Sequence, residues 1–241
     1  MNHCFKLVVV GNAGVGKTTF IKRHLTGEFE KAYNPTMGVD VHTLTLRTNH
    51  GQLVFNVWEV GGQGKYDENR KQYYQGANAV LVMADITSVS SKQATFSWLT
   101  EVRNVAGTIP AVICYNKNDI GHGKRSYGLM EGVYCELKIP QILISAKSNV
   151  DAPFLWLGQK LLNKNDLQFV PGPSVSCYPG EDHPRAADSQ GETTKTQSDE
   201  GQALTTLLLR SMEGGHKTSD DRDAALVPID VMAKILTKLL V

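Results

Sequence analysis

The residues with the clearest capacity for chemistry lie between residues 11 and 18. Their spacing, G-x-x-x-x-G-K-T, is typical of a phosphate-binding loop. Glycines allow successive backbone N–H groups to turn toward an anion, and a helix N-terminus adds unpaired donors. Lys17 can reach the β- and γ-phosphates of a nucleotide, and Thr18 can offer its hydroxyl to Mg²⁺. A plain glycine turn is the alternative, but an apolar run before the loop and a helical pattern after it favour phosphate binding. The stretch is Gly11-Asn12-Ala13-Gly14-Val15-Gly16-Lys17-Thr18.

Two later stretches indicate which base accompanies the phosphates. Asn116-Lys117-Asn118-Asp119 places a carboxylate that can accept hydrogen bonds from the N1–H and the exocyclic amine of guanine. Adenine cannot supply these donors, and a site left with unpaired polar groups rejects the wrong base strongly. Ser145-Ala146-Lys147 can present a backbone N–H to the guanine O6. In this order after a phosphate loop, the motifs predict a site for GTP or GDP with Mg²⁺.

The elements that must position these motifs alternate between strand and helix. Apolar or β-branched runs predict strands at 5–10, 39–47, 53–58, 79–84, 111–115 and 141–145. Helical periodicity predicts helices at 17–25, 91–105 and 152–162, with weaker helices ending near 73–76 and spanning 127–137. The helix at 91–105 has Phe96, Leu99 and Val102 on one stripe. The pattern predicts an α/β fold with a mostly parallel six-stranded sheet and helices on both faces. Ligands of such sheets bind at the carboxyl ends of the strands, where Asp85, Asn116 and Ser145 fall.

Composition divides the 241 residues into a folded part and a tail. We expect one domain at 1–171, a polar and disordered tail at 172–223, and an amphipathic helix at 224–241. This helix docks on its own domain, frays, or serves a partner or a membrane.

The overall charge and the cysteines indicate the class and the compartment of the protein. The net charge of +1 gives no electrostatic support for bulk binding of nucleic acid. The four cysteines form no C-x-x-C pair, which favours reduced thiols in the cytosol or nucleus. The chain ends without a cysteine for prenylation, so we expect no lipid anchor.

With these motifs in order, the chain resembles the Ras superfamily of small GTPases, and within it the Ran family. The resemblance covers about residues 5–169. It rests on residues 16–33, 38–51 and 55–58, and on SAKSN and PFLWL at 145–149 and 153–157. It implies a P-loop NTPase G domain that binds GTP or GDP with Mg²⁺. It also implies slow GTP hydrolysis that depends on an activating protein, and the use of an exchange factor.

The resemblance also assigns roles to individual positions. Gln63 would orient the attacking water, with Lys17 as the second catalytic residue. Thr18 and Thr36 would reach Mg²⁺, and Glu59 would act on it through a water. Phe29 would pack against guanine, and Gly62 would donate its N–H to the γ-phosphate. The implied nucleotide-binding set is Asn12, Ala13, Gly14, Val15, Gly16, Lys17, Thr18, Thr19, Phe29, Glu30, Lys31, Ala32, Tyr33, Asn34, Pro35, Thr36, Gly62, Asn116, Lys117, Asp119, Ser145, Ala146 and Lys147.

The chain departs from the family pattern at the second switch loop. The family has Asp-Thr-Ala-Gly-Gln-Glu where this chain has Glu59-Val60-Gly61-Gly62-Gln63-Gly64. Glu59 keeps the charge but adds a methylene next to an ion with strict octahedral geometry. The added glycines raise the entropy cost of ordering the loop. Ala13 stands where the Ran family has glycine, and its methyl could crowd the γ-phosphate.

The sequence therefore favours a Ran-like GTP-dependent switch in nucleocytoplasmic transport, found in nucleus and cytoplasm, with importin-type receptors as partners. Only Lys124, Arg125 and Lys138 remain where Ran has a basic cluster, which weakens the expected receptor contact. A diverged pseudo-GTPase that serves as an interaction module is the first alternative. A membrane-traffic GTPase without a lipid anchor is the second. The partner of the tail is not indicated by its sequence.

Overall fold

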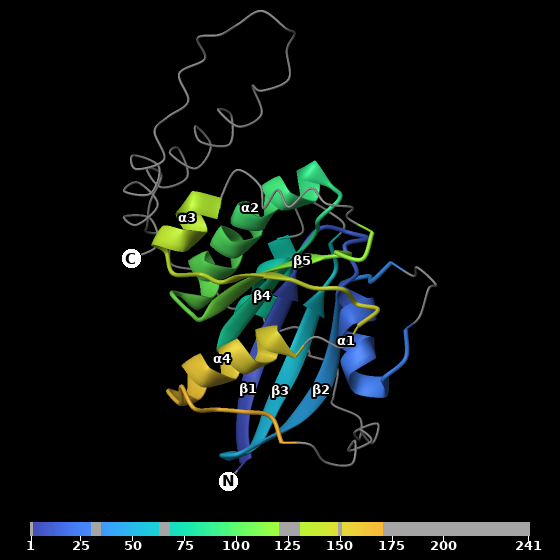
Figure 1. Ribbon diagram of the computed structural model, residues 1–241. Helices are drawn as coiled ribbons and strands as arrows, with labels where there is room; N and C mark the ends of the chain where they lie inside the picture. Colours follow the sequence, from blue (N-terminus) through green and yellow to red (C-terminus); the bar gives the residue numbers. More distant parts are fainter. Residues whose placement is uncertain (1, 30–34, 63–67, 121–130, 149–150, 171–241) are drawn as a thin grey trace, which may run out of the picture. The chain divides into compact units, whose positions relative to one another are not determined.

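The fold alternates strands and helices as the sequence predicts (Figure 1). The computed structural model describes residues 2–29, 35–62, 68–120, 131–148 and 151–170. In chain order the elements are β1 (Asn2–Val10), α1 (Lys17–Thr26), β2 (Val39–Thr48), β3 (Gly51–Val60), the 3₁₀ helix η1 (Glu68–Tyr74), β4 (Ala79–Asp85), α2 (Val89–Ala106), β5 (Ala111–Asn116), α3 (Glu131–Glu136), β6 (Gln141–Leu143) and α4 (Ala152–Leu162).

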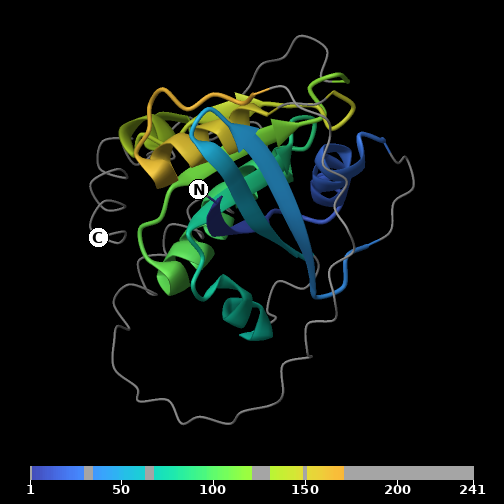
Figure 2. The same cartoon turned by 90° about the horizontal axis from the view of Figure 1, so that it is seen from below.

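The six strands form one sheet in the order β2-β3-β1-β4-β5-β6. All neighbouring strands are parallel except β2 and β3, which form an antiparallel hairpin with Thr48 opposite Gly51. Figure 2 shows this long hairpin in blue to teal. The prediction of a six-stranded, mostly parallel sheet is confirmed. The parallel strands bring their carboxyl ends to the same edge, where the nucleotide motifs begin.

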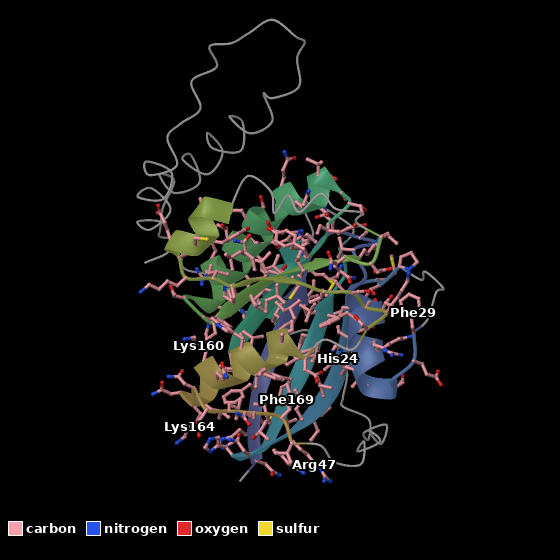
Figure 3. All side chains as sticks on the ribbon, in the orientation of Figure 1. His24, Phe29, Arg47, Lys160, Lys164 and Phe169 are labelled. Carbon is pink, nitrogen blue, oxygen red and sulfur yellow. The ribbon has the colours of Figure 1, made fainter. Side chains whose placement is uncertain are left out.

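Helices cover both faces of this sheet. On one face, Phe20 of α1 stacks on Phe154 of α4 with ring centroids 5.6 Å apart. His24 of α1, labelled in Figure 3, also contacts Phe154, with centroids 4.8 Å apart. Alternate residues of β1, β4 and β5 join this core cluster, and the residues between them are also buried. On that side α2 contacts β4 and β5. Such burial on both faces explains why these strands are continuous apolar runs.

Several boundaries differ from the expected ones. β1 begins at Asn2 rather than at residue 5, and β6 ends at Leu143 because the following residues enter a loop. The expected helix at 127–137 is described only as α3, since residues 121–130 lie outside the described part. The weak helix near 73–76 is the 3₁₀ helix η1.

The expected stripe on α2 is partly wrong. Its buried face is Thr95, Trp98, Leu99 and Val102, whereas Phe96 is only half-buried. The buried positions follow the i, i+3, i+4, i+7 pattern, which Phe96 misses by one position.

The proposed tail at 172–241 lies outside the described residues, so its disorder and terminal helix stay predictions. Among the described helices, none combines the length and the apolar character that a membrane span requires. Cys4, Cys114 and Cys135 are free thiols. Cys114 is fully buried, as expected of a small apolar residue, and burial raises the pKa of its thiol.

Candidate functional site

The phosphate-binding loop lies between β1 and α1 and is built around Lys17. The Lys17 ammonium is buried and donates hydrogen bonds to the carbonyl oxygens of Gly11 at 2.8 Å and Asn12 at 3.1 Å. Burial lowers the pKa of Lys17 to about 8, an effect that the charge of Glu59 opposes. Gly11 has φ +144°, and a β-carbon there would overlap the backbone carbonyl of Met83. Only glycine fits this position, because both its backbone angle and its neighbour exclude a side chain.

Asn116 ties the phosphate loop to the predicted base-recognition loop. Its buried side-chain amide donates to the Val15 carbonyl at 2.8 Å. Its side-chain oxygen accepts from the Ala146 N–H at 3.0 Å. The N-K-x-D and S-A-K motifs, far apart in sequence, therefore meet the phosphate loop through one side chain.

Asp119 is held in place as a hydrogen-bond acceptor. Ser145 Oγ donates to one carboxylate oxygen at 2.7 Å, and Lys147 Nζ lies 2.5 Å from the other. Hydrogen bonds from Lys147 and Ser145 hold the pKa of Asp119 below its usual value. An ionised carboxylate has only acceptors, which is what the two N–H groups on the edge of guanine need.

Lys117 is anchored at the end of β4. Its ammonium lies 2.7 Å from Asp85 Oδ2, and its backbone has φ +65°. Burial alone would raise the pKa of Asp85, but hydrogen bonds from Lys117 and Thr87 outweigh burial and lower it. Asp85 and Lys117 therefore fix each other at the carboxyl edge of the sheet.

The predicted metal-binding residues converge although they come from three segments. Thr18 Oγ1 donates to Glu59 Oε1 at 2.5 Å, and Thr36 Oγ1 donates to the same oxygen at 3.3 Å. The two hydroxyl oxygens are 3.1 Å apart. Adjacent oxygen ligands of an octahedral Mg²⁺ with bonds of about 2.0–2.1 Å lie about 2.8–3.0 Å apart, close to this separation. The residues therefore fit Mg²⁺, with two hydroxyls as ligands and Glu59 as the carboxylate that orients them.

The glycines after β3 have a packing role. The Gly61 N–H donates to the Gly38 carbonyl at 2.8 Å, and a β-carbon on Gly61 would lie 2.5 Å from the Thr36 carbonyl oxygen. A β-carbon on Gly62 would lie 2.5 Å from the Gly11 carbonyl oxygen and would overlap the Asn12 and Ala13 backbone. The loosening of this loop by its glycines stays a prediction. The structure shows that Gly61 allows close contact with the segment around Thr36.

Trp98 is a contact that sequence reasoning missed. Its indole N–H donates to the side-chain oxygen of Asn12 at 2.8 Å, so α2 positions a phosphate-loop residue. The Arg70 guanidinium of η1 lies 4.7 Å from the Trp98 ring centroid and forms an ion pair with Glu101. Glu101 also accepts a hydrogen bond from Tyr74 at 3.0 Å. A large amphipathic side chain on an apolar helix stripe was the only sequence signal, and it does not identify a partner.

Some predicted site residues cannot be placed. Gln63, Glu30, Lys31, Ala32, Tyr33 and Asn34 lie outside the described residues. Phe29 is on the loop that follows α1 (Figure 3) and is partly buried against the core cluster. Its predicted contact with guanine stays a prediction.

A phosphate loop, an N-K-x-D loop and an S-A-K loop at one edge of this sheet define a small GTPase. Residues 6–163, about two thirds of the chain, match the family model of the Ras family. The chain belongs to the Ras family. Members of this family generally bind GTP or GDP with Mg²⁺, hydrolyse GTP, and work with activating proteins and exchange factors.

Proposed function

We propose that the protein is a Ran-like GTP-dependent switch that hydrolyses GTP slowly and acts in the transport of proteins between nucleus and cytoplasm. The observation that carries the switch is the meeting of Thr18, Thr36 and Glu59. These residues join the phosphate loop, the first switch segment and β3 through hydroxyl and carboxylate groups. A ligand that competes for those groups changes the position of the first switch segment, and a partner can detect that change.

The proposed likeness to Ran is supported by the sequence rather than by the contacts of the site. Residues 16–33 and the SAKSN and PFLWL stretches carry the resemblance to Ran. Importin-type receptors, an activating protein and an exchange factor are the partners it implies, in nucleus and cytoplasm. These partners are proposed from the sequence resemblance.

The residues of the chain have separate tasks in the proposed reaction. Lys17 and the loop N–H groups bind the phosphates, and Asp119 selects guanine. Bound Mg²⁺ supplies charge stabilisation to the phosphates. Gln63 orients water in the proposed reaction. Arg70 is engaged with Glu101 and Trp98, so we expect the stimulating arginine to come from a partner. In Ras and Gα, a stimulating arginine raises the rate of GTP hydrolysis by a factor of about 10³–10⁵.

The decisive experiment measures the identity and occupancy of the nucleotide in purified full-length protein, followed by single-turnover hydrolysis of bound GTP. We expect guanine nucleotide, a slow rate, and a slower rate in Gln63→Leu. Receptor binding in the GTP state and its absence in the GDP state would support the transport role. Guanine nucleotide and hydrolysis without receptor binding in either state would retain the switch and refute transport.

A pseudo-GTPase is the second candidate, and the tight packing near the phosphate loop favours it. Gly62 lies against the backbone of Gly11 to Ala13 with no room for a methyl group. Glu59 already accepts hydrogen bonds from both expected Mg²⁺ ligands. This candidate predicts that Gln63→Leu leaves turnover unchanged, because the wild-type protein has no turnover to lose.

A further inference from the structure

Glu59 carries a second oxygen that the nucleotide site does not use. Its Oε1 accepts from Thr18 and Thr36, whereas Oε2 has no hydrogen-bond partner among the described residues. The side chain is 1% exposed. A buried carboxylate oxygen without a partner is costly, because the group has lost its hydration without replacement.

A histidine faces this oxygen, and among the described residues its ring nitrogen also has no hydrogen-bond partner. His42 Nε2 is buried and makes no hydrogen bond within the part of the chain that the structure describes. It lies 4.0 Å from Glu59 Oε2, beyond hydrogen-bonding distance. A tetrahedral ion with bonds of about 2.0–2.2 Å holds its ligand atoms about 3.4 Å apart, so one ion would satisfy both atoms after they approach by about 0.6 Å.

A third ligand comes from the same face of the hairpin. Asp40 pairs directly with Glu59 across the β2–β3 ladder, and His42 follows Asp40 by two residues on the same face. Ligand atoms of Asp40, His42 and Glu59 all lie within 4.8 Å of one another. Asp40 is exposed, and His42 is partly exposed, so the group opens to solvent at the Asp40 end. Because Asp40 is exposed, its side chain has room to rotate toward the other two ligands.

We propose that Asp40, His42 and Glu59 bind a divalent first-row transition ion, of which Zn²⁺ is the probe, beside the nucleotide site. One imidazole with two carboxylates suits Zn²⁺ better than Mg²⁺, which prefers oxygen ligands. Three protein ligands leave a coordination position open for water or a partner group. Glu59 also orients Thr18 and Thr36. Binding of an ion to its Oε2 therefore affects the position of the first switch segment, which contains Thr36. The ligand set lies on β2 and β3 and does not depend on the proposed transport role.

The test uses full-length protein with its bound nucleotide in excess Mg²⁺. Zn²⁺ binding is measured by calorimetry, and the His42 imidazole is followed by ¹⁵N NMR. We expect one Zn²⁺ whose binding shifts the His42 Nε2 resonance. Both His42→Ala and Asp40→Asn should lose at least about 10-fold in affinity, the loss that even an outer partner of a metal ligand causes.

His50→Ala is the matched control. His50 lies in the turn between β2 and β3, and its Nε2 is 2.9 Å from Oδ2 of Asp166, which follows α4, so the variant removes a histidine–carboxylate pair elsewhere. Its Zn²⁺ affinity should equal that of wild type. His42→Cys should restore binding, since a thiolate is a zinc ligand, and this separates ligand loss from misfolding.

Two results would overturn the proposal. Zn²⁺ binding unchanged in His42→Ala would show that the ion merely replaces Mg²⁺ at the nucleotide or binds thiols and histidines elsewhere. No Zn²⁺ binding with an intact His42 resonance would show that His42 and Glu59 interact only as a pair of charges.

Discussion

Replacing Trp98 by phenylalanine tests whether α2 holds the phosphate loop. The substitution keeps an aromatic ring in the buried position but removes the indole N–H that donates to Asn12 Oδ1 at 2.8 Å. The hydrogen bond contributes about 0.5–1.5 kcal/mol net. Trp98 is 8% exposed, and the smaller ring gives up burial worth about 0.8 kcal/mol for each lost CH₂ equivalent. Part of the attraction to Arg70, about 0.5–1 kcal/mol, is also lost.

Together these effects should lower the free energy of unfolding by about 2–4 kcal/mol, summing the losses of hydrogen bonding, burial and cation–π contact. Urea denaturation followed by circular dichroism measures this change. The Kd for GDP should rise about 5-fold, because a phosphate loop that Trp98 no longer holds in place loses about 1 kcal/mol of binding free energy. Trp156→Phe is the control. Trp156 is only partly buried on α4, with the Lys160 ammonium 5.6 Å from its ring, and it belongs to the opposite helix layer.

A double-mutant cycle of Trp98→Phe with Asn12→Ala isolates the pair. We expect a coupling free energy of about 1 kcal/mol for groups in direct contact. A coupling within about 0.3 kcal/mol of zero would refute the claim that Trp98 positions Asn12. So would a Trp98→Phe effect no larger than that of Trp156→Phe.

Three further substitutions address other contacts of the site. Asn116→Ala leaves the Val15 carbonyl and the Ala146 N–H without their partner. It should lower the free energy of unfolding by about 2–4 kcal/mol in urea, with Asn56→Ala nearly neutral as its control. Gly61→Ala should lower the free energy of unfolding by about 1–2 kcal/mol. The overlap of the new methyl group with Thr36 destabilises the folded state by more than the lower entropy of the unfolded chain stabilises it. A variant as stable as wild type, or more stable, would contradict this. Lys117→Met should raise the pKa of Asp85, as followed by ¹³C NMR of the carboxyl group. Because the folded pKa is depressed in wild type, the associated stability is present above about pH 4 and is lost as the pH falls through the folded pKa, so the two proteins should converge in acid.

The six strands of the sheet and the nucleotide motifs could be predicted because their signals are local. A glycine loop between an apolar run and a helix specifies its own conformation, and continuous apolar runs identify β4 and β5 as central strands. Thr18 could be assigned because its neighbours define the motif. Thr36 and Glu59 meet in the structure, and the roles toward Mg²⁺ that the family resemblance implied for them stay predictions.

Contacts between distant segments could not be predicted in the same way. The bond from Trp98 to Asn12 depends on how α2 lies against the phosphate loop, and a helical stripe only shows which side is buried. The grouping of Asp40, His42 and Glu59 depends on the register of β2 against β3, which a shift of one residue would reverse. The close approach of Gly61 to Thr36 is a property of three-dimensional packing, so the sequence suggested only flexibility there.

The buried side-chain amide of Asn116 couples the binding of the guanine base to the binding of the phosphates. Its two hydrogen bonds keep the loop for the base and the loop for the phosphates at a constant separation before either is filled. Guanosine and pyrophosphate, offered as separate fragments, should therefore each meet a subsite whose distance from the other is set by one side chain. An intact nucleotide should bind more tightly than the two fragments together, because it loses translational freedom once while it fills both subsites. The same amide means that a fragment bound to one loop stiffens the other, so the two fragments should bind cooperatively although they share no contact.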